Sequence, residues 1–388
     1  MNKELFSVIV LHYNQPSYVF TALSSVLKQN YERIELIFVD DASSDIDKEA
    51  IKKYIQENKN ENIENVSFLF NEENMGTVKT INRAVKSASG KHILFFAADD
   101  ALFNKNVITN FNNAFEKADS DVYMISSQCL MMDEELKDII EPFVHHTQVV
   151  SFNRMTSYDQ FKLFSSTCFL AIGATAIRKD MFEQFGYFNE EYKFIEDWSY
   201  FLHLTRSGGR IQYSDFNGLL HRDGGISHYL STSSLPPHVL QYKLDLLHIY
   251  ENEIFPYFKD FGFVEQVNIF EKYKAEKCAY YAGGGTQNLL PPFKLIRTFP
   301  RYYLNVIVSP FVNSWVLLIK SIRALTYVSI IYFAAVFSQK ALGSTFITNL
   351  ITVCVGCIFY TMIVASLLIL VAIAGLKLLR IIKRCFKG

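Results

Sequence analysis

Three pairs of polar residues, each directly after an apolar segment, carry the chemistry of the N-terminal part of the chain. They are Tyr13-Asn14, Asp40-Asp41 and Asp99-Asp100. Carboxylates are hard oxygen ligands, and a divalent cation is usually held by one or two of them together with substrate phosphates. Asp41 can accept hydrogen bonds from a base or a ribose, and Tyr13 can stack on that base. The alternative is that Asp40 and Asp41 only cap the following helix, as Asp often does.

A further acidic pair, Glu196-Asp197, stands at the expected start of a helix. A carboxylate in that place can act as a general base, removing the proton from a hydroxyl as its oxygen attacks. Consecutive helical residues face about 100° apart, so the two side chains point in different directions. The alternative is an acidic first turn that the helix macrodipole favours.

The first half of the chain alternates strand-like apolar segments with helix-like amphipathic ones. Strands are expected at residues 5–11, 34–39, 66–70 and 92–96, and helices at residues 17–29, 46–58 and 77–88. Such alternation is typical of a largely parallel sheet covered by helices on both faces. Ligands of these sheets bind beyond the carboxyl ends of the strands. The three polar pairs lie at those ends, so we expect one ligand crevice with His12 at its edge.

Charge is distributed unevenly over the 388 residues, although the formal net charge is only −1. Residues 1–288 contain 27 Lys or Arg against 39 Asp or Glu, a balance of −12, whereas residues 289–388 contain 11 Lys or Arg and no acid. The acidic part argues against nucleic acid as a partner, because phosphate binding requires clustered basic residues. Six cysteines are too few for a disulfide framework.

The C-terminal part is basic and apolar, which indicates a membrane region in residues 301–388. Residues 341–376 form an uncharged run of 36 residues, and about 20 apolar residues are enough to cross a bilayer. Residues 302–339, interrupted by Lys320 and Arg323, are either an interfacial helix followed by a crossing or one long tilted crossing.

The basic residues also predict the orientation in the membrane. Five of them follow Leu376, so the positive-inside rule places the C-terminus in the cytosol. The opening residues lack the pattern of a cleavable signal, and we expect the N-terminal domain in the cytosol too. Two crossings, joined by a turn near residues 338–345, satisfy both conditions. The expected location is therefore the inner membrane, with the N-terminal domain on its cytoplasmic face.

Nine short motifs occur in a fixed order between residues 5 and 227. They are Phe6–Asn14, Ser24–Gln29, Val39–Asp45, Asn74–Gly76, Asn82, Ala88–Lys91, Ala97–Asp100, Gly186–Glu191 and Phe194–Trp198. Together they resemble the family-two glycosyltransferases, whose GT-A fold is an α/β, Rossmann-like, mostly parallel sheet flanked by helices. The expected organisation is a GT-A domain at 1–227, a helical or linker region at 228–300, and an α-helical membrane region at 301–388.

The resemblance implies a role for each matching residue of the donor side. Tyr13 would stack on the nucleobase, Asp41 would hydrogen-bond it, and Asp99 would contact the ribose. Asn14 belongs to the same nucleotide-binding set. Asp100 would hold Mn²⁺ or Mg²⁺ against the diphosphate.

The resemblance also implies an acceptor side with Asp197 as the general base. One base, one metal and in-line attack would invert the anomeric configuration in a single displacement. Glu196 and Trp198 are accessory candidates, and Trp198 would either stack on a sugar face or pack in the core. His221 would either approach the diphosphate and metal or lie on the surface.

Some positions depart from the family's common pattern. Ala97 stands where the first Asp of an acidic triplet is usual, and Ile81 stands where Arg is frequent. Lys79 or Arg83 would then be the basic residue near the phosphates. No Gln-x-x-Arg-Trp motif follows Asp197, so the pattern of a processive polymerase is not present.

We therefore expect an inverting, metal-dependent, non-processive glycosyltransferase. It would move a sugar from a nucleotide-sugar donor to a lipid-linked or membrane-proximal saccharide in bacterial surface polysaccharide assembly. A catalytically inactive, membrane-anchored nucleotide-sugar-binding or scaffold protein is the alternative, against which Asp100 and Asp197 argue. The sugar, the base, the acceptor, its linkage and the formation of a homo-oligomer stay open.

Overall fold

The computed structural model describes residues 3–223, 235–287 and 336. The chain divides into two compact units, residues 1–289 and residues 290–388, and all of the helices and strands below belong to the first. The first unit thus includes most of the segment predicted as a helical or linker region. The predicted membrane region, 301–388, lies outside the described residues apart from residue 336.

The first four strands and three helices occur where the sequence predicts them. They are β1 (Phe6–His12), α1 (Val19–Leu27), β2 (Ile34–Asp40), α2 (Lys48–Asn58), β3 (Ile63–Phe70), α3 (Thr77–Ser87) and β4 (His92–Ala97). Every residue of β2 is buried, as expected for a continuous apolar segment in the middle of a parallel sheet. The strand and helix types of this half are therefore confirmed.

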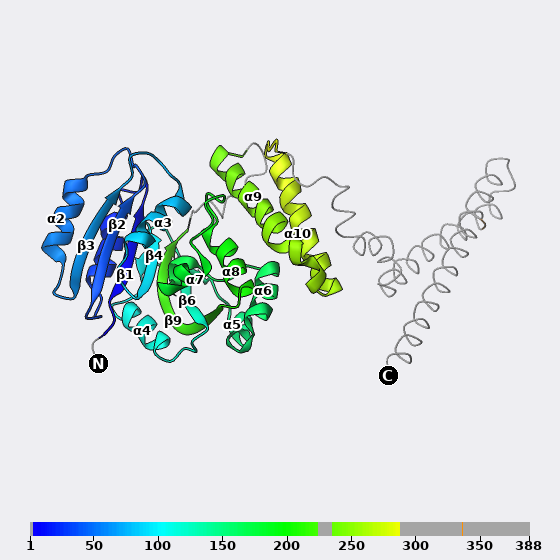
Figure 1. The fold of residues 1–388 in the computed structure, drawn as a ribbon. Helices are drawn as coiled ribbons and strands as arrows, with labels where there is room; N and C mark the ends of the chain where they lie inside the picture. Colours follow the sequence, from blue (N-terminus) through cyan, green and yellow to red (C-terminus); the bar gives the residue numbers. More distant parts are fainter. Residues whose placement is uncertain (1–2, 224–234, 288–335, 337–388) are drawn as a thin grey trace. The chain divides into compact units, whose positions relative to one another are not determined.

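The sheet is parallel in its first half and mixed in its second half. Strands β3, β2, β1 and β4 are neighbours in that order and run parallel (Figure 1). Beyond β4 come β8 (Thr175–Arg178), β6 (Val122–Met132), β9 (Arg210–Arg222) and β5 (Ala101–Leu102). Of these, only the pair β6 and β9 is parallel. The expected mostly parallel sheet is thus corrected to a mixed one.

Both faces of the parallel half are covered. Val8 and Phe38 belong to a core that also contains buried residues of α1, α2 and α4 (Val107–Phe115). The adjacent strand residues Ile9 and Ile37 point to the opposite face, because side chains alternate along a strand, and they are equally buried. Buried residues of α3, such as Ile81, cover that face. The predicted helix layers are therefore present.

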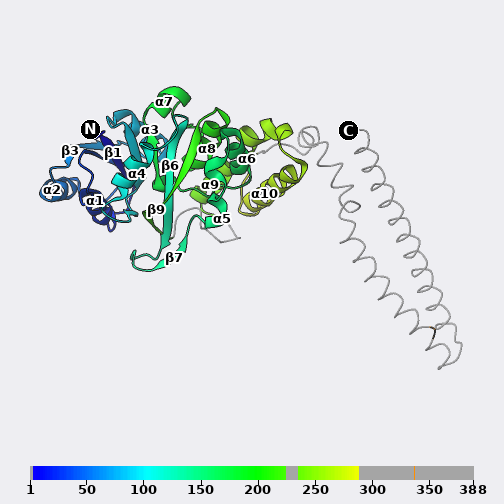
Figure 2. The same ribbon diagram turned by 90° about the horizontal axis from the view of Figure 1, so that it is seen from below.

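The segment between β5 and β9 supplies the other elements that precede β9 in the chain. They are α4, β6, β7 (Ile139–Pro142), α5 (His146–Val149), η1 (Phe152–Arg154), α6 (Ser157–Ser166), η2 (Ile172–Ala174), β8, α7 (Asp180–Phe185) and α8 (Glu196–Arg206). Figure 2 shows β7 extending away from the rest of the sheet, where it pairs only with the end of β6. Helices α6 and α8 lie against each other.

A helical layer follows the sheet in the chain and packs on α6 and α8. It comprises α9 (Pro237–Ile249), the π-helical turn η4 (Tyr250–Ile254), η5 (Phe255–Asp260) and α10 (Phe263–Ala282). Tyr250 contacts the ring of Trp198 edge-on at 5.2 Å, and Arg206 pairs with Glu253 at 3.0 Å. Within residues 3–223 and 235–287 we find no helix with the length and apolar character needed to span a bilayer.

Candidate active site

The carboxyl ends of β1, β2 and β4 lie side by side at one edge of the sheet. His12 is in register with Asp40, and Leu11 is in register with Ala97. The polar pairs 13–14, 40–41 and 99–100 therefore meet at the same edge, which we call the donor edge. Parallel pairing is what brings together residues that are far apart along the chain.

A buried hydrogen-bond network joins the ends of β1 and β2. The Asp40 carboxylate lies 2.8 Å from His12 Nδ1 and accepts hydrogen bonds from both the hydroxyl and the backbone N–H of Ser43. Burial by itself would raise the pKa of Asp40, but the hydrogen bonds from His12 and Ser43 outweigh it and leave the pKa below its usual value. Asp40 is therefore an ionised anchor inside the fold.

The loops above this network adopt a conformation that non-glycine residues rarely use. Asn14 and Ala42 have φ values of 51° and 61°, in the left-handed region. Asn14 donates its backbone N–H to Ser43 Oγ at 2.8 Å and accepts the backbone N–H of Ser44 at 3.0 Å. Strained backbone of this kind is maintained only where the surroundings enforce it, and it is frequent at ligand sites. Tyr13, beside Asn14, is 47% exposed and free to stack on a ligand.

Asp41 holds a neighbouring loop to the end of β2. Its carboxylate is buried and accepts hydrogen bonds from Asn71 Nδ2 at 2.6 Å and from the backbone N–H groups of Met75 and Gly76 at 2.9 Å each. Arg83 also donates to Asn71. The Arg83 guanidinium thus contacts this loop. The predicted contact of Asp41 with a nucleobase would use a remaining lone pair of the carboxylate.

The acidic pair Asp99-Asp100 is placed differently. Asp99 accepts a hydrogen bond from Gln15 through Oδ2 at 2.6 Å, while its buried Oδ1 has no partner among the described residues. Burial, reinforced by the charge of Asp100, raises the pKa of Asp99. Asp100 accepts the backbone N–H of Arg222 at 3.1 Å, and both of its oxygens lie 3.0 Å from His221 Nδ1.

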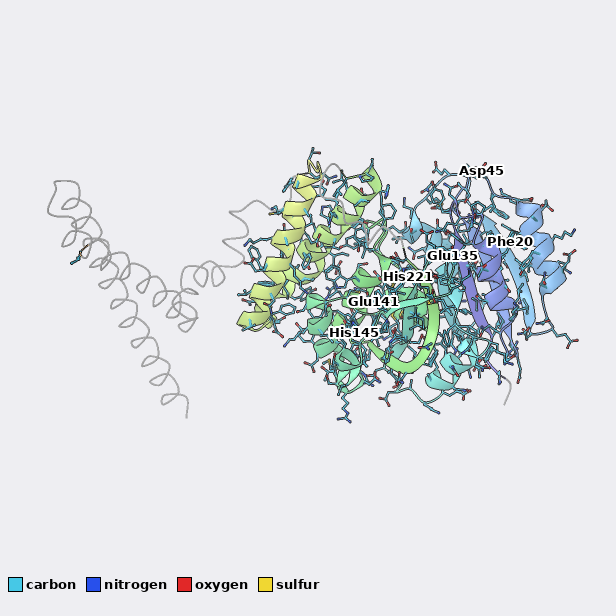
Figure 3. All side chains as sticks on the ribbon, turned by 180° about the vertical axis from the view of Figure 1, so that it is seen from behind. Phe20, Asp45, Glu135, Glu141, His145 and His221 are labelled. Carbon is cyan, nitrogen blue, oxygen red and sulfur yellow. The ribbon has the colours of Figure 1, made fainter. Side chains whose placement is uncertain are left out.

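His221 reaches Asp100 because β9 pairs with the short strand β5. Ala101 is in register with Leu220, so the residue after Leu220 meets the residue before Ala101. Figure 3 shows His221 between the strands of the N-terminal half and the helices of the C-terminal half. Burial lowers the pKa of His221, but the hydrogen bond and charge of Asp100 outweigh that effect and raise it overall. The structure thus places His221 beside Asp100, while its predicted approach to a diphosphate and metal stays a prediction.

The donor set at Asp99, Asp100 and His221 fits a divalent cation chemically. Carboxylate and imidazole are suitable ligands for Mn²⁺, and the unpartnered Oδ1 of Asp99 is the kind of acceptor that a cation satisfies. In the described part of the chain, no group of three or more His, Cys, Asp or Glu residues is arranged to hold a metal by itself. The residues present therefore suit a cation that also binds substrate phosphates.

The second acidic pair, Glu196-Asp197, forms the first turn of α8. Asp197 accepts the backbone N–H of Trp198 at 2.6 Å. Burial raises the pKa of both carboxyl groups above their usual values, and the charge of Asp197 raises that of Glu196 further. Burial raises the pKa values of Cys168 and Tyr242, and the charge of Asp197 raises both further. We call the first turn of α8, with Glu196 and Asp197, the acceptor edge.

Trp198 is part of the core. Its side chain is buried, and its indole Nε1 donates to the carbonyl oxygen of Phe164 at 2.7 Å. Together with the edge-on contact to Tyr250, this is the packing alternative predicted for Trp198 rather than a stack on a sugar.

Three polar residues for which the sequence predicts no role position these edges. Asn71 binds Asp41, Gln15 binds Asp99, and Asp245 of α9 accepts the backbone N–H groups of Lys193 and Phe194 just before α8. The sequence spacing of these residues does not predict their hydrogen-bond partners, because each partner is distant along the chain.

Residues 7–186 match the family described as Glycosyl transferase family 2. The match supports the resemblance stated above for the segment that contains the donor edge. It ends before Glu196, so the acceptor edge lies outside it.

Several curated relatives are similar to parts of the chain. An uncharacterized glycosyltransferase of Haemophilus influenzae is 23% identical over 223 residues, which cover 55% of this chain and 64% of that protein. The putative teichuronic acid biosynthesis glycosyltransferase TuaG of Bacillus subtilis is 33% identical over 98 residues, 25% of this chain and 37% of that protein. The chain thus spans less than two thirds of the length of these relatives.

Among solved structures, similarity extends to the crystal structure of S. aureus TarS 1–349 in complex with UDP-GlcNAc. That structure has a TM-score of 0.47 and 21% sequence identity, over 70% of this chain and 72% of that one.

Proposed function

We propose that this protein is an inverting glycosyltransferase that uses a nucleotide-sugar donor. The observation that best supports the proposal is the composition of the two edges. The donor edge offers an exposed aromatic ring at Tyr13 and the acidic pair Asp99-Asp100 beside His221, and the acceptor edge offers a carboxylate of raised pKa at Asp197. The family match of residues 7–186 and the relatives named glycosyltransferase support the same class.

At the donor edge, Tyr13 would stack on the base and Asp41 and Asp99 would bind the nucleoside. Asp100, beside His221, would hold Mn²⁺ or Mg²⁺ together with the diphosphate. When bound, the cation would neutralise charge on the diphosphate and make it a better leaving group. The His12–Asp40–Ser43 network keeps the loops that carry Tyr13 and Asp41 in one conformation before the donor arrives.

At the acceptor edge, Asp197 would remove the proton from the attacking hydroxyl. A general base works best when its pKa lies near the working pH, and burial moves the pKa of Asp197 upward in that direction. Attack opposite the leaving diphosphate would invert the anomeric configuration. No protein-bound sugar intermediate is needed.

The acceptor is proposed to be a lipid-linked or membrane-proximal saccharide of a bacterial cell surface. The names of two relatives support this setting: the putative teichuronic acid biosynthesis glycosyltransferase of Bacillus subtilis and the teichoic acid poly(glycerol phosphate) polymerase of Staphylococcus epidermidis. The apolar, basic sequence of residues 301–388 supports attachment to the inner membrane from its cytoplasmic side.

Turnover tests the function directly. The detergent-solubilised full chain should release nucleoside diphosphate from at least one nucleotide sugar in a screen, and Mn²⁺ should increase the rate. The acid limb of its pH profile should lie above the usual Asp pKa of 3.8, because the base is active only when ionised. Tight nucleotide-sugar binding without turnover would instead identify a binding or scaffold protein.

Membrane attachment has its own test. With the native cysteines replaced, a cysteine introduced at Ser344 should react with an impermeant thiol reagent on intact cells, and one at Gly388 only after permeabilisation. The reverse pattern would contradict the proposed orientation.

A further inference from the structure

The position of Asp197 depends on the loop that leads into α8. This loop, residues 186–195, begins after α7 and ends at the start of α8. Among the described residues, no side chain caps the N-terminus of α8 at Ile195. Helix ends are normally held by such caps, so hydrogen bonds to the preceding loop supplement the packing of Trp198 in holding the first turn that contains Asp197.

Several buried side chains bind that loop, among them Asn82 and Asp245. Near its start, Asn82 of α3 donates to the carbonyl oxygen of Phe188 at 2.9 Å and accepts the backbone N–H of Phe188 at 3.1 Å. Near its end, Oδ2 of Asp245 accepts the consecutive backbone N–H groups of Lys193 at 2.7 Å and Phe194 at 2.9 Å. Of Asn82 and Asp245, Asp245 binds the loop at the positions nearer in sequence to Asp197.

Asp245 is itself held firmly. Its side chain is only 1% exposed, and its second oxygen accepts a hydrogen bond from Gln241 Nε2 at 2.7 Å. The carboxylate belongs to α9, which also carries Tyr242, whose pKa the charge of Asp197 helps to raise. A buried carboxylate that accepts backbone N–H groups forms charge-assisted hydrogen bonds, which are shorter and stronger than neutral ones.

The same loop touches the donor side. A Cβ atom added to Gly76 would lie 3.8 Å from the carbonyl oxygen of Lys193, in ordinary van der Waals contact. The backbone N–H of Gly76 is bound by Asp41, and that of Lys193 by Asp245. Asp41 and Asp245 thus bind two stretches of backbone that lie close to each other.

We infer that Asp245 is a positioning residue for the reaction, which places the Asp197 carboxylate against the acceptor hydroxyl. The inference rests on the proposed function, and it makes α9 a working part of the transferase although α9 lies outside the segment that matches the family. Positioning is worth much to a reaction, since a misplacement of about 1 Å can cost on the order of 10²-fold in rate.

The test is a graded series at this position, Asp245→Asn and Asp245→Ala, in the full chain. Asn retains one oxygen for the two N–H groups, whereas Ala retains none. Turnover should fall by on the order of tenfold in the first variant and 10²-fold in the second. The KM for the donor and the binding of nucleoside diphosphate should change much less than turnover, because Asp245 binds Lys193 and Phe194 rather than a residue of the donor edge.

Asp260→Asn, at an exposed position, is the control. It removes a carboxylate of the same helical layer, which accepts a hydrogen bond from Tyr158 of α6 and does not bind the 186–195 loop. Its turnover should equal that of the wild type. Amide hydrogen exchange supplies a second readout, since residues 189–197 should exchange faster in Asp245→Asn than in the control while the sheet stays protected.

The outcomes separate the inference from the function on which it rests. Wild-type turnover with unchanged turnover in both Asp245 variants would overturn the inference and leave the function standing. A loss of turnover that merely follows a general loss of stability, with exchange raised throughout the fold, would also overturn it. Absence of turnover in the wild type with every donor would remove the proposed function and the inference together.

Discussion

The donor edge and the acceptor edge use the same residue type for opposite purposes. At the donor edge, the carboxylates of Asp40 and Asp41 are buried but surrounded by donors, and the pKa of Asp40 is lowered. At the acceptor edge, burial raises the pKa values of Glu196 and Asp197 because fewer hydrogen bonds compensate it. The environment of a carboxyl group, rather than its presence, decides whether it holds a loop or is able to exchange a proton.

The two edges are also assembled in different ways. The donor edge follows from parallel strands in register, so its residues come from the ends of strands β2, β1 and β4, which are neighbours in the sheet. The acceptor edge requires contacts among α3, α8 and α9, through Asn82 and Asp245. Only the first arrangement is local enough to be predicted from a pattern in the sequence.

The largest effect is expected for Asp197, the proposed general base. Asp197→Asn should reduce turnover by on the order of 10²–10⁴-fold, the usual range for a general base. Binding of nucleoside diphosphate, measured by calorimetry, should not change, because Asp197 belongs to the other edge. Wild-type turnover in a correctly folded variant would show that another group removes the proton.

The next effect concerns the metal. Asp100→Asn should weaken the Mn²⁺-dependent part of nucleoside diphosphate binding by on the order of 10-fold or more, since even the outer partners of metal ligands are typically worth 10–100-fold. Titrations with and without Mn²⁺ measure it. Equal enhancement by Mn²⁺ in variant and wild type would mean that other residues hold the ion.

Loss of the hydrogen bonds by which Asp41 holds the loop at Met75 and Gly76 should affect stability as well as nucleotide binding. We call these hydrogen bonds the clamp. Asp41→Ala removes the acceptor of the Met75 N–H and one of the two acceptors of the Gly76 N–H, which costs about 1–3 kcal/mol in the free energy of unfolding. Urea denaturation measures this cost, and nucleotide affinity should fall with it. Asp45→Ala, at an exposed position of the same segment, is the control and should change neither. Equal stability of both variants would contradict the clamp.

The raised pKa of Glu196 predicts that replacing this residue with Gln stabilises the fold at high pH. In the folded state this carboxyl group holds its proton more tightly than in the unfolded chain, so ionisation costs stability as the pH rises from the unfolded pKa to the folded one. Glu196→Gln should therefore raise the melting temperature by on the order of a few degrees at about pH 9 and hardly at all at about pH 4. A gain that is the same at both pH values would argue against a titrating Glu196.

The smallest effect is expected for the exposed ring of the donor edge. Tyr13→Ala should weaken nucleotide binding by about 1 kcal/mol, the lower end of base–aromatic stacking. The melting temperature should stay the same, because the side chain is 47% exposed and contributes little to the core. A fall in stability without a change in affinity would assign Tyr13 a purely structural role.

The sequence by itself determined the parallel half of the fold and the residues of the donor edge. Apolar segments such as those around Ile37 and Phe95 have the length of buried strands, and the amphipathic segments between them have helical spacing. Both signals are local, and parallel strands place their carboxyl ends at one edge. The order of residues along the chain is therefore enough to predict that Tyr13, Asp41 and Asp100 gather at that edge.

Tertiary structure alone decided the mixed second half of the sheet, the meeting of His221 with Asp100 and the attachment of Lys193 to Asp245. His221 reaches Asp100 because two antiparallel strands pair over a long separation, and Asp245 binds backbone N–H groups, which every residue except proline carries. A hydrogen bond to a backbone N–H group therefore cannot be predicted from the type of residue that carries it. The pKa of Asp197 likewise depends on the loss of surrounding water, which arises only when distant helices pack around it.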